Sequence, residues 1–296
     1  MITIQITDIC LMQNLKIGWI GLGKMGIPMA EQLINAGYAL SVYNRSKDKE
    51  ASLKAKGVEV ASTPSSLLAE CDLIFLMVSD DEAVKQIFTA ENGLFANEST
   101  GKIIVNMSTV SPGISKEMAA LCERKGNAYL DAPVSGSVKQ AETGTLVIMV
   151  GGEENAFEKV KPVFEKLGKL SMRVGDNGAG NSAKLAINSL LALHAQGLAE
   201  TVLFAQANQI NTEDLLTLIG NSAIGNIFGK IKGDAIVADN YSAAFALKHI
   251  VKDLKLAKAE GLSAPLADAA LATFQNAENK YGNEDIIAVL KALKEK

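Results

Sequence analysis

The chain has 296 residues, of which 48% are hydrophobic and 21% are charged, a composition typical of folded globular proteins and unlike that of disordered ones. Its net charge of -4 provides no general attraction to nucleic acid or to anionic membranes, so we expect neither as a partner. The three cysteines form no CxxC pair and there are only two histidines, so we expect no metal, no disulfide framework and a reducing, cytoplasmic location.

Residues 1–15 are expected to be an N-terminal extension that leads into the first strand. They have no basic leading region before their short apolar stretch, so they do not resemble a secretory signal. Met12 directly precedes the first clear pattern, QNLKIGWIGLG, and residues 1–11 are either a real extra strand or the product of an upstream start codon. The most apolar run, Leu185 to Ala199, is interrupted by polar side chains and is too short to predict a membrane span.

Short apolar segments alternate with helical patterns between Lys16 and Gly175. The apolar segments are KIGWIG (16–21), ALSVYN (39–44), DLIFLMV (72–78) and KIIVNMS (102–108), and the helical patterns begin at Lys24, Lys47, Asp80 and near Pro112. This alternation predicts parallel strands joined by crossover helices. The runs LIFLMV and LVIMV are continuously apolar, which indicates strands covered on both faces. Thr63 and Ser111 each precede a proline and indicate helix starts. We predict an α/β Rossmann-type doubly wound sheet over residues 16–176.

The pattern changes after Gly175, where strand signals end. About 25 residues with helical spacing follow GDNGAGNS, and Asn211 then provides a cap for another helix with acidic residues in its first turn. Further helical patterns cover about 245–260, 265–279 and 283–294. We therefore predict an all-α C-terminal domain over residues 177–296.

A glycine-rich turn lies between the first predicted strand and the first predicted helix. In such a turn the first glycine permits the tight bend, the second lets the backbone approach a pyrophosphate, and the third allows helix and strand to pack closely. The helix start then favours the anion. The alternative is a tight turn without a ligand. The expected cofactor contacts here are Gly21, Leu22, Gly23, Lys24, Met25 and Gly26.

The end of the second predicted strand indicates which dinucleotide binds. NAD-binding proteins usually have a carboxylate there for the ribose 2'-hydroxyl, whereas this chain has Asn44, Arg45 and Ser46. An arginine would pair with a 2'-phosphate, so we expect NADP, with NAD bound at lower affinity. The alternative is that Arg45 is a solvated surface charge. Val78 and Ser79, after the next apolar strand, complete the expected contacts at this edge.

Four motifs resemble the β-hydroxyacid dehydrogenase family: GWIGLGKMGIPMA (18–30), DAPVSGS (131–137), GAGNSAKLAIN (178–188) and LKHIVKDLKLA (247–257). They occur in the family's order, and the resemblance is greatest to its glyoxylate/succinic semialdehyde reductase branch. It implies an NADP(H)-dependent oxidoreductase that interconverts a small hydroxy acid and its semialdehyde or oxo acid. It also implies an active site between the two domains and a homodimer or homotetramer.

The resemblance assigns Lys184 as the catalytic acid and base, with Asn188 one helical turn later to orient the substrate or the lysine. Partial burial would lower the pKa of such a lysine toward the working pH. The alternative is a lysine that extends to solvent. The resemblance also implies that Ser135, Gly136 and Ser137 bind the substrate carboxylate, although Ser137 stands where the family usually has glycine. The alternative is a plain Ser-Gly turn.

Other matching positions have weaker assignments. Thr109 resembles a cofactor contact near the nicotinamide, or is a cap for the helix near Pro112. Phe245 and Asp253 match substrate-pocket positions and Lys252 matches a cofactor-binding lysine, or they belong to an ordinary exposed helix face. Lys248 would add positive potential, whereas no role is expected for His194 or His249. The alternative functions are 3-hydroxyisobutyrate or tartronate semialdehyde turnover, imine reduction, and non-catalytic NADPH binding.

Overall fold

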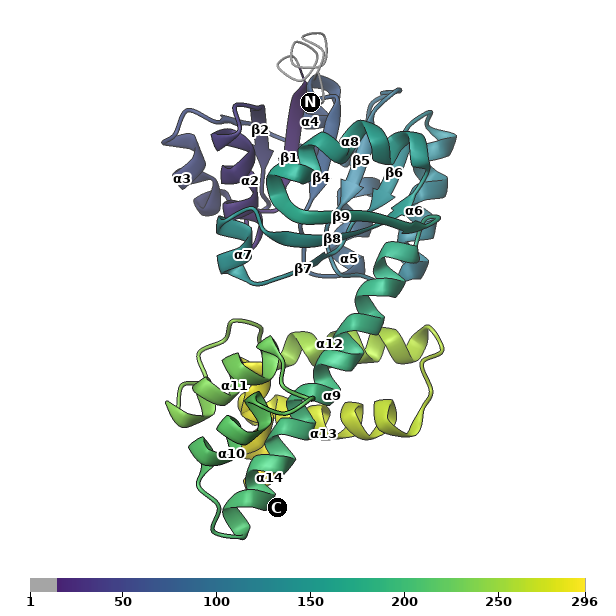
Figure 1. Ribbon diagram of the computed structural model, residues 1–296. Helices are drawn as coiled ribbons and strands as arrows, with labels where there is room; N and C mark the ends of the chain where they lie inside the picture. The colour runs from purple at the N-terminus through teal and green to yellow at the C-terminus, as the bar shows by residue number, and fades with distance from the viewer. Residues whose placement is uncertain (1–14, 296) are drawn as a thin grey trace, which may run out of the picture. The chain divides into compact units, whose positions relative to one another are not determined.

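The computed structural model describes residues 15–295, within which the chain forms two compact units (Figure 1). The first unit ends at Lys184 and the second begins at Leu185. Apart from Leu15, the expected N-terminal extension lies outside the described residues. In the described part of the chain, no helix is long and apolar enough to cross a membrane.

A nine-stranded sheet is the centre of the first unit (Figure 1). Its strands are β1 (Lys16–Ile20), β2 (Ala39–Tyr43), β3 (Glu59–Val60), β4 (Leu73–Leu76), β5 (Ile103–Asn106), β6 (Ala128–Asp131), β7 (Val134–Ser135), β8 (Leu146–Gly152) and β9 (Gly168–Gly175). They lie in the order β3-β2-β1-β4-β5-β6-β8-β7, with β9 paired to β8. The pairings from β3 to β6 are all parallel, which confirms the doubly wound fold class. The order in which the strands are added to the sheet reverses between β1 and β4, which remain parallel. Such folds bind ligands at this point, beyond the carboxyl ends of the strands.

Helices cover both faces of this sheet (Figure 1). They are α2 (Gly26–Asn35), the 3-10 helix η1 (Lys47–Glu50), α3 (Ala51–Lys54), α4 (Pro64–Glu70), α5 (Asp81–Thr89), α6 (Pro112–Arg124), α7 (Val138–Glu142) and α8 (Glu154–Leu167). Successive strand residues point to opposite faces. In β4, Phe75 joins the core beneath α2 and α8, whereas Ile74 and Leu76 join the core beneath α4, α5 and α6. Both faces are therefore buried, which explains the continuous apolar run.

Two strands, β8 and β9, follow the parallel series from β3 to β6. The LVIMV segment forms the expected strand, β8, which pairs antiparallel with β6 and β7 and parallel with β9. Here the chain returns through the PVSGS turn and the short α7 instead of a long crossover helix. β9 has no counterpart among the predicted strands. Its sequence, GKLSMRVG, mixes charged and apolar residues because it is only partly buried.

The expected helix starts at the two prolines are confirmed. The Thr63 side chain accepts a hydrogen bond from the Ser66 N–H at 3.1 Å, and the Ser111 side chain accepts one from the Ile114 N–H at 3.0 Å. Each proline occupies an early helical position where its missing N–H costs nothing. The helix expected at Lys47 is instead the 3-10 helix η1 followed by the four-residue α3.

The second unit is entirely helical in its described part. Its helices are α9 (Ala179–Ala207, which begins in the first unit), α10 (Thr212–Gly220), α11 (Ile227–Val237), α12 (Leu247–Ala259), α13 (Pro265–Tyr281), the 3-10 helix η2 (Ile286–Ala288) and α14 (Val289–Lys294). α11 is absent from the predicted helices because Gly229 and Gly233 weaken its helical signal. At Gly233 the two helices are close, since a Cβ there would lie 2.8 Å from the Leu216 side chain of α10.

A buried ion pair stabilises the second unit. Lys232 of α11 lies 2.7 Å from Asp285, and their side chains are 9% and 4% exposed. The second oxygen of Asp285 accepts hydrogen bonds from the N–H groups of Ala244 and Phe245 at 3.1 and 3.3 Å. The pair therefore holds the segment before α12, including the predicted pocket residue Phe245, against the start of η2.

Candidate active site

The glycine turn after β1 has the geometry that a dinucleotide site requires. Gly21 has a φ of +101°, and a Cβ there would lie 2.2 Å from the Met77 carbonyl oxygen. A Cβ at Gly26 would lie 2.0 Å from the Gly21 carbonyl oxygen, so only glycine lets α2 begin this close to β1. A Cβ at Gly23, by contrast, would meet no atom within 4 Å. Nothing within the described protein requires glycine at 23, and the open space there is where a pyrophosphate would approach.

The start of α2 is electrostatically suited to an anion. Its first turn contains no acidic residue, and Met25 provides no side-chain cap for the helix N–H groups. The positive end of the helix dipole therefore lacks a negative partner from the first turn. Together with the open space above Gly23, these features fit the pyrophosphate of a dinucleotide.

Asn44 connects the glycine turn to the loop after β2. Its side-chain oxygen accepts a hydrogen bond from the Leu22 N–H at 2.9 Å, and its amide group donates to the Ser46 carbonyl at 2.8 Å. Its own N–H donates to Glu50 Oε1 at 2.8 Å. Asn44 thus uses its hydrogen-bonding groups to shape the loop, while the neighbouring Arg45 and Ser46 are exposed.

Glu50 is a buried carboxylate that the sequence pattern does not reveal, because it lies six residues beyond Asn44, which occupies the usual position at the end of β2. It is 5% exposed, and its Oε1 also lies 2.9 Å from the Lys47 ammonium. The same oxygen therefore accepts the hydrogen bond from the Asn44 N–H and pairs with the Lys47 ammonium. Arg45 makes no hydrogen bond or ion pair among those found for residues 15–295, so its charge is available to a ligand.

The loops after β4 and β5 are bonded to each other. The Val78 N–H donates to Ser108 Oγ at 2.8 Å, and the Ser79 hydroxyl donates to Asp80 at 2.7 Å. Thr109 follows Ser108 in this loop. Because Ser111 caps α6, the alternative that Thr109 is the helix cap is wrong. The predicted contacts Val78, Ser79 and Thr109 therefore lie on loops at the carboxyl edge of the parallel sheet.

A buried polar cluster anchors the first turn of α9. Asp131, fully buried at the end of β6, accepts hydrogen bonds from the N–H groups of Gly178 and Asn181 at 2.7 and 2.9 Å. Burial raises the pKa of this carboxyl, although these backbone hydrogen bonds lower it in part. A Cβ at Gly180 would lie 2.5 Å from the Met149 carbonyl oxygen. The glycines of the GAGNSAK motif therefore allow α9 to start directly against the sheet.

The loop after β7 accommodates the departure from the usual family motif. Gly136 has a φ of +144°, which favours glycine, whereas Ser137 has an ordinary φ of -108°. The N–H and hydroxyl of Ser137 both donate to Gln140 Oε1, at 2.8 and 2.6 Å. Serine is therefore unstrained at position 137, where it stabilises the start of α7 while Ser135 remains half-buried.

Lys184 and Asn188 occupy successive turns of α9 and are 7% and 2% exposed. Asn188 donates to Asp253 Oδ2 at 2.6 Å. The other oxygen, Asp253 Oδ1, lies 3.3 Å from the Lys252 ammonium and accepts no hydrogen bond from the described residues. Three predicted residues, Asn188, Lys252 and Asp253, are therefore brought together by α9 and α12, with Asp253 3% exposed.

Phe245 and Lys248 lie outside this cluster of three residues. The ring of Phe245, which is half-buried, lies 6.1 Å from that of the exposed His249. The ammonium of the exposed Lys248 donates to Asn283 at 2.8 Å. His194 is also exposed, with its ring 6.3 Å from that of Phe228.

Comparison with known proteins identifies the family of the chain. Residues 16–175 match the model described as the NAD binding domain of 6-phosphogluconate dehydrogenase. Residues 178–293 match the NAD-binding model of NADP-dependent 3-hydroxyisobutyrate dehydrogenase. The chain belongs to the β-hydroxyacid dehydrogenase family. It is an NAD(P)-dependent oxidoreductase that acts on a hydroxyl group, as the named relatives are.

Two relatives and one solved structure show how far this similarity extends. Glyoxylate/succinic semialdehyde reductase 2 of Arabidopsis thaliana is 35% identical over 95% of this chain and 80% of its own length. The 2-hydroxy-3-oxopropionate reductase of Escherichia coli (strain K12) is 37% identical over 94% and 97%. The structure of Mycobacterium tuberculosis 3-hydroxyisobutyrate dehydrogenase with L-serine has a TM-score of 0.87 and 29% identity, covering 95% of this chain and 99% of that one.

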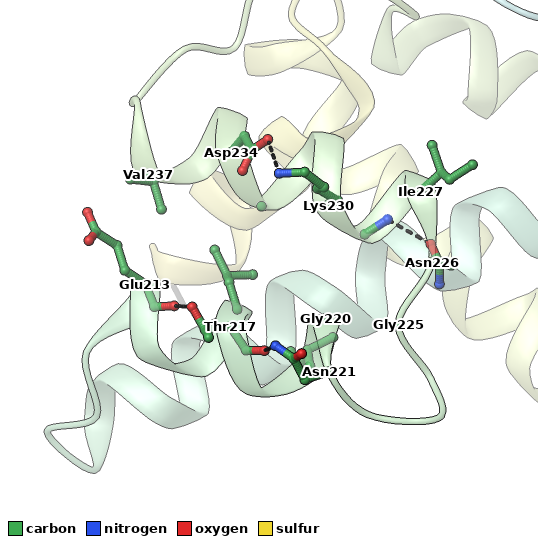
Figure 2. Close-up of a pocket in the computed structure, with 14 residues that line it drawn as sticks. Glu213, Thr217, Gly220, Asn221, Gly225, Asn226, Ile227, Lys230, Asp234 and Val237 are labelled. Carbon is green, nitrogen blue, oxygen red and sulfur yellow. Dashed lines mark hydrogen bonds and ion pairs between the residues drawn. The ribbon is translucent and has the colours of Figure 1, made fainter.

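One cavity of this β-hydroxyacid dehydrogenase is lined by none of the predicted site residues. It is a cavity of about 850 Å³ between α10 and α11, and Figure 2 shows residues such as Thr217, Asn226 and Ile227 lining it. It contains none of the dehydrogenase motifs, so we do not assign the reaction to it. Among the described residues, no cluster of three or more His, Cys, Asp or Glu side chains is suited to hold a metal.

Proposed function

We propose that this β-hydroxyacid dehydrogenase interconverts a small hydroxy acid and its semialdehyde or oxo acid, prefers NADP(H), and uses Lys184 as its general acid and base. The observation that carries the proposal is Lys184 itself, a buried cation in the first turns of α9, one turn before the buried Asn188. Lysine side chains are seldom buried this deeply, and a buried titratable group beside matching motif residues is a candidate for acid-base chemistry.

In the direction of reduction, the bound cofactor supplies a hydride to the carbonyl carbon of the substrate. Lys184, as an ammonium, donates a proton to the carbonyl oxygen, and the product is an alcohol. In oxidation, the neutral amine accepts the hydroxyl proton while the hydride leaves for the cofactor. A general acid and base of this kind must exchange its proton near the working pH.

The substrate carboxylate would be held by the loop from Ser135 to Ser137, whose N–H and hydroxyl groups provide donors without a net charge. Asn188 would orient the substrate or Lys184. The hydrogen bond from Asn188 to Asp253 at 2.6 Å supports this role, because it fixes which way the amide points. Phe245 would form an apolar wall of the substrate pocket.

The preference for NADP rests on the loop after β2. Residues 44–46 contain no carboxylate, Arg45 is exposed, and the nearby Glu50 oxygen already accepts the Asn44 N–H and the Lys47 ammonium. A 2'-phosphate would therefore meet an available guanidinium. Thr109 and Lys252 would contact the rest of the cofactor.

The proposed substrates are glyoxylate and succinic semialdehyde, in keeping with the name of the Arabidopsis relative. The test is a steady-state panel with NADPH or NADH and glyoxylate, succinic semialdehyde, tartronate semialdehyde or methylmalonate semialdehyde. We expect the highest kcat/KM with NADPH and one of the first two. If no member of the panel is turned over, this proposal is refuted.

A homodimer or homotetramer is also proposed. Large apolar side chains are exposed on or beside α10 and α11, where Leu218, Ile224 and Ile227 are 67%, 72% and 80% exposed. A second copy of the chain would remove this surface from water. Sedimentation equilibrium tests the expectation, and a monomer at micromolar concentration contradicts it.

A further inference from the structure

We propose that Asn181 is a positioning residue that ties the loop carrying Thr109 to the start of the helix carrying Lys184. This inference rests on the proposed roles of Thr109 and Lys184. Asn181 itself would contact neither substrate nor cofactor. Its role would be to keep Thr109 and Lys184 at a fixed position relative to each other.

The side chain of Asn181 bridges segments far apart in sequence. It is completely buried, and its Oδ1 accepts a hydrogen bond from the Val110 N–H at 3.0 Å. Its Nδ2 donates to Ser115 Oγ of α6 at 3.1 Å. Val110 directly follows Thr109, and Lys184 follows Asn181 by three residues on α9. One amide group therefore connects the proposed nicotinamide contact to the proposed proton donor.

The backbone of Asn181 is held as firmly as its side chain. The N–H group donates to Asp131 Oδ2 at 2.9 Å, while Asp131 Oδ1 accepts from the Gly178 N–H at 2.7 Å. The carboxylate lies at the positive end of α9, where a negative charge is favourable. Asp131 belongs to the central sheet, so its hydrogen bond fixes Asn181 to a rigid element. The side chain of Asn181 in turn fixes the loop that contains Thr109 and Val110.

The loop is tethered on both sides of Thr109. Before it, Ser108 Oγ accepts from the Val78 N–H at 2.8 Å, and after it, Val110 donates to Asn181. Without Asn181 the second tether is lost, and Val110 keeps a buried N–H without its partner. Thr109 would then shift relative to Lys184. Hydride and proton transfer need both groups in place at once, and a displacement of about 1 Å costs up to about a hundredfold in rate.

The test compares Asn181→Ala with two control variants in the full-length protein, using NADPH and the best substrate of the panel. Ser115→Ala removes the other partner of the amide but leaves the Val110 bond. Asn177→Ala removes a neighbouring asparagine whose side chain, within residues 15–295, bonds only to the Tyr129 carbonyl, at 2.8 Å. For Asn181→Ala we expect kcat to fall about tenfold or more with the NADPH KM within threefold, and both controls to keep kcat within twofold. We also expect a larger kinetic isotope effect on kcat with NADPH deuterated at the transferred position.

A second variant, Asn181→Asp, tests whether a decrease in kcat reflects a general loss of folding. In Asn181→Asp the new carboxyl is placed at a completely buried position, and burial favours its protonated form. It then provides one acceptor and one donor, as the amide does, so kcat should stay within threefold. The proposal is overturned if Asn181→Ala keeps kcat within twofold, or if Asn177→Ala loses as much kcat. Lys184→Ala is measured in parallel: full turnover there refutes the proposed function and this inference with it, whereas an inactive Lys184→Ala beside an unaffected Asn181→Ala refutes only the inference.

Discussion

Replacing Arg45 by alanine should change which dinucleotide the protein prefers. Arg45 is exposed on the loop after β2, and Asn44 holds that loop through its bonds to Leu22 and Ser46. The loop geometry therefore does not depend on the arginine side chain. Its removal should leave the glycine turn intact and take away only the proposed partner of the 2'-phosphate.

The expected magnitude follows from the exposure of Arg45. A hydrogen bond to a charged group contributes about 1.5–3 kcal/mol, and solvent around an exposed guanidinium favours the lower value. About 1.4 kcal/mol corresponds to a factor of ten in affinity. We therefore expect the Kd for NADPH to rise about tenfold, while the Kd for NADH, which has no 2'-phosphate, stays within twofold.

The assay is a fluorescence titration of NADPH and NADH into the parent protein and the variant, which needs no knowledge of the substrate. Lys56→Ala is the matched control, because it removes the same charge from a lysine that pairs with Glu31 at 2.6 Å. It should change neither Kd by more than twofold. The NADPH advantage of the parent should also shrink as salt is added. Equal weakening of NADPH and NADH by Arg45→Ala would refute the 2'-phosphate role.

Three further changes test the site and the fold. Lys184→Ala should lower kcat by about a hundredfold to ten-thousandfold with little change in NADPH affinity, and stopped-flow rates near those of the parent would remove Lys184 from the mechanism. Asp285→Ala should lower the free energy of unfolding by about 3–5 kcal/mol, because Lys232 is left buried and unpaired; urea titration measures this, and a loss below about 1 kcal/mol contradicts it. Gly26→Ala should abolish binding of both dinucleotides, since its Cβ would lie 2.0 Å from the Gly21 carbonyl oxygen, and calorimetry showing intact binding would count against the tight turn.

Local features were predictable from the sequence because nearby residues produce them. The glycine turn, the helix starts after Thr63 and Ser111, and the cap at Asn211 each involve contacts within a few residues. The two-sided burial of β4 was also visible, since a strand covered on both faces must be apolar throughout. The direction of β8 was not visible, because an apolar run is the same read in either direction.

Partners distant in sequence explain the other differences. Glu50 looks like one of several charged residues on a solvated turn until the fold places its carboxylate against the Asn44 N–H. Asn188 and Asp253 are 65 residues apart, and no spacing rule joins them. α11 was missed because Gly233 weakens a helix locally, and only the tertiary structure shows that this glycine lies close to the Leu216 side chain of α10.

The sequence by itself determined the fold class, the dinucleotide turn and the position of Lys184 on its helix, because these depend on apolar periodicity, glycine geometry and residue order. Only the tertiary structure decided how these parts are held. The bonds from Asn181 to Val110 and to Asp131 span 71 and 50 residues. Such pairs form because a buried polar group needs a hydrogen-bond partner, which the fold can bring from any part of the chain. The residues between the two partners therefore do not predict the pairing.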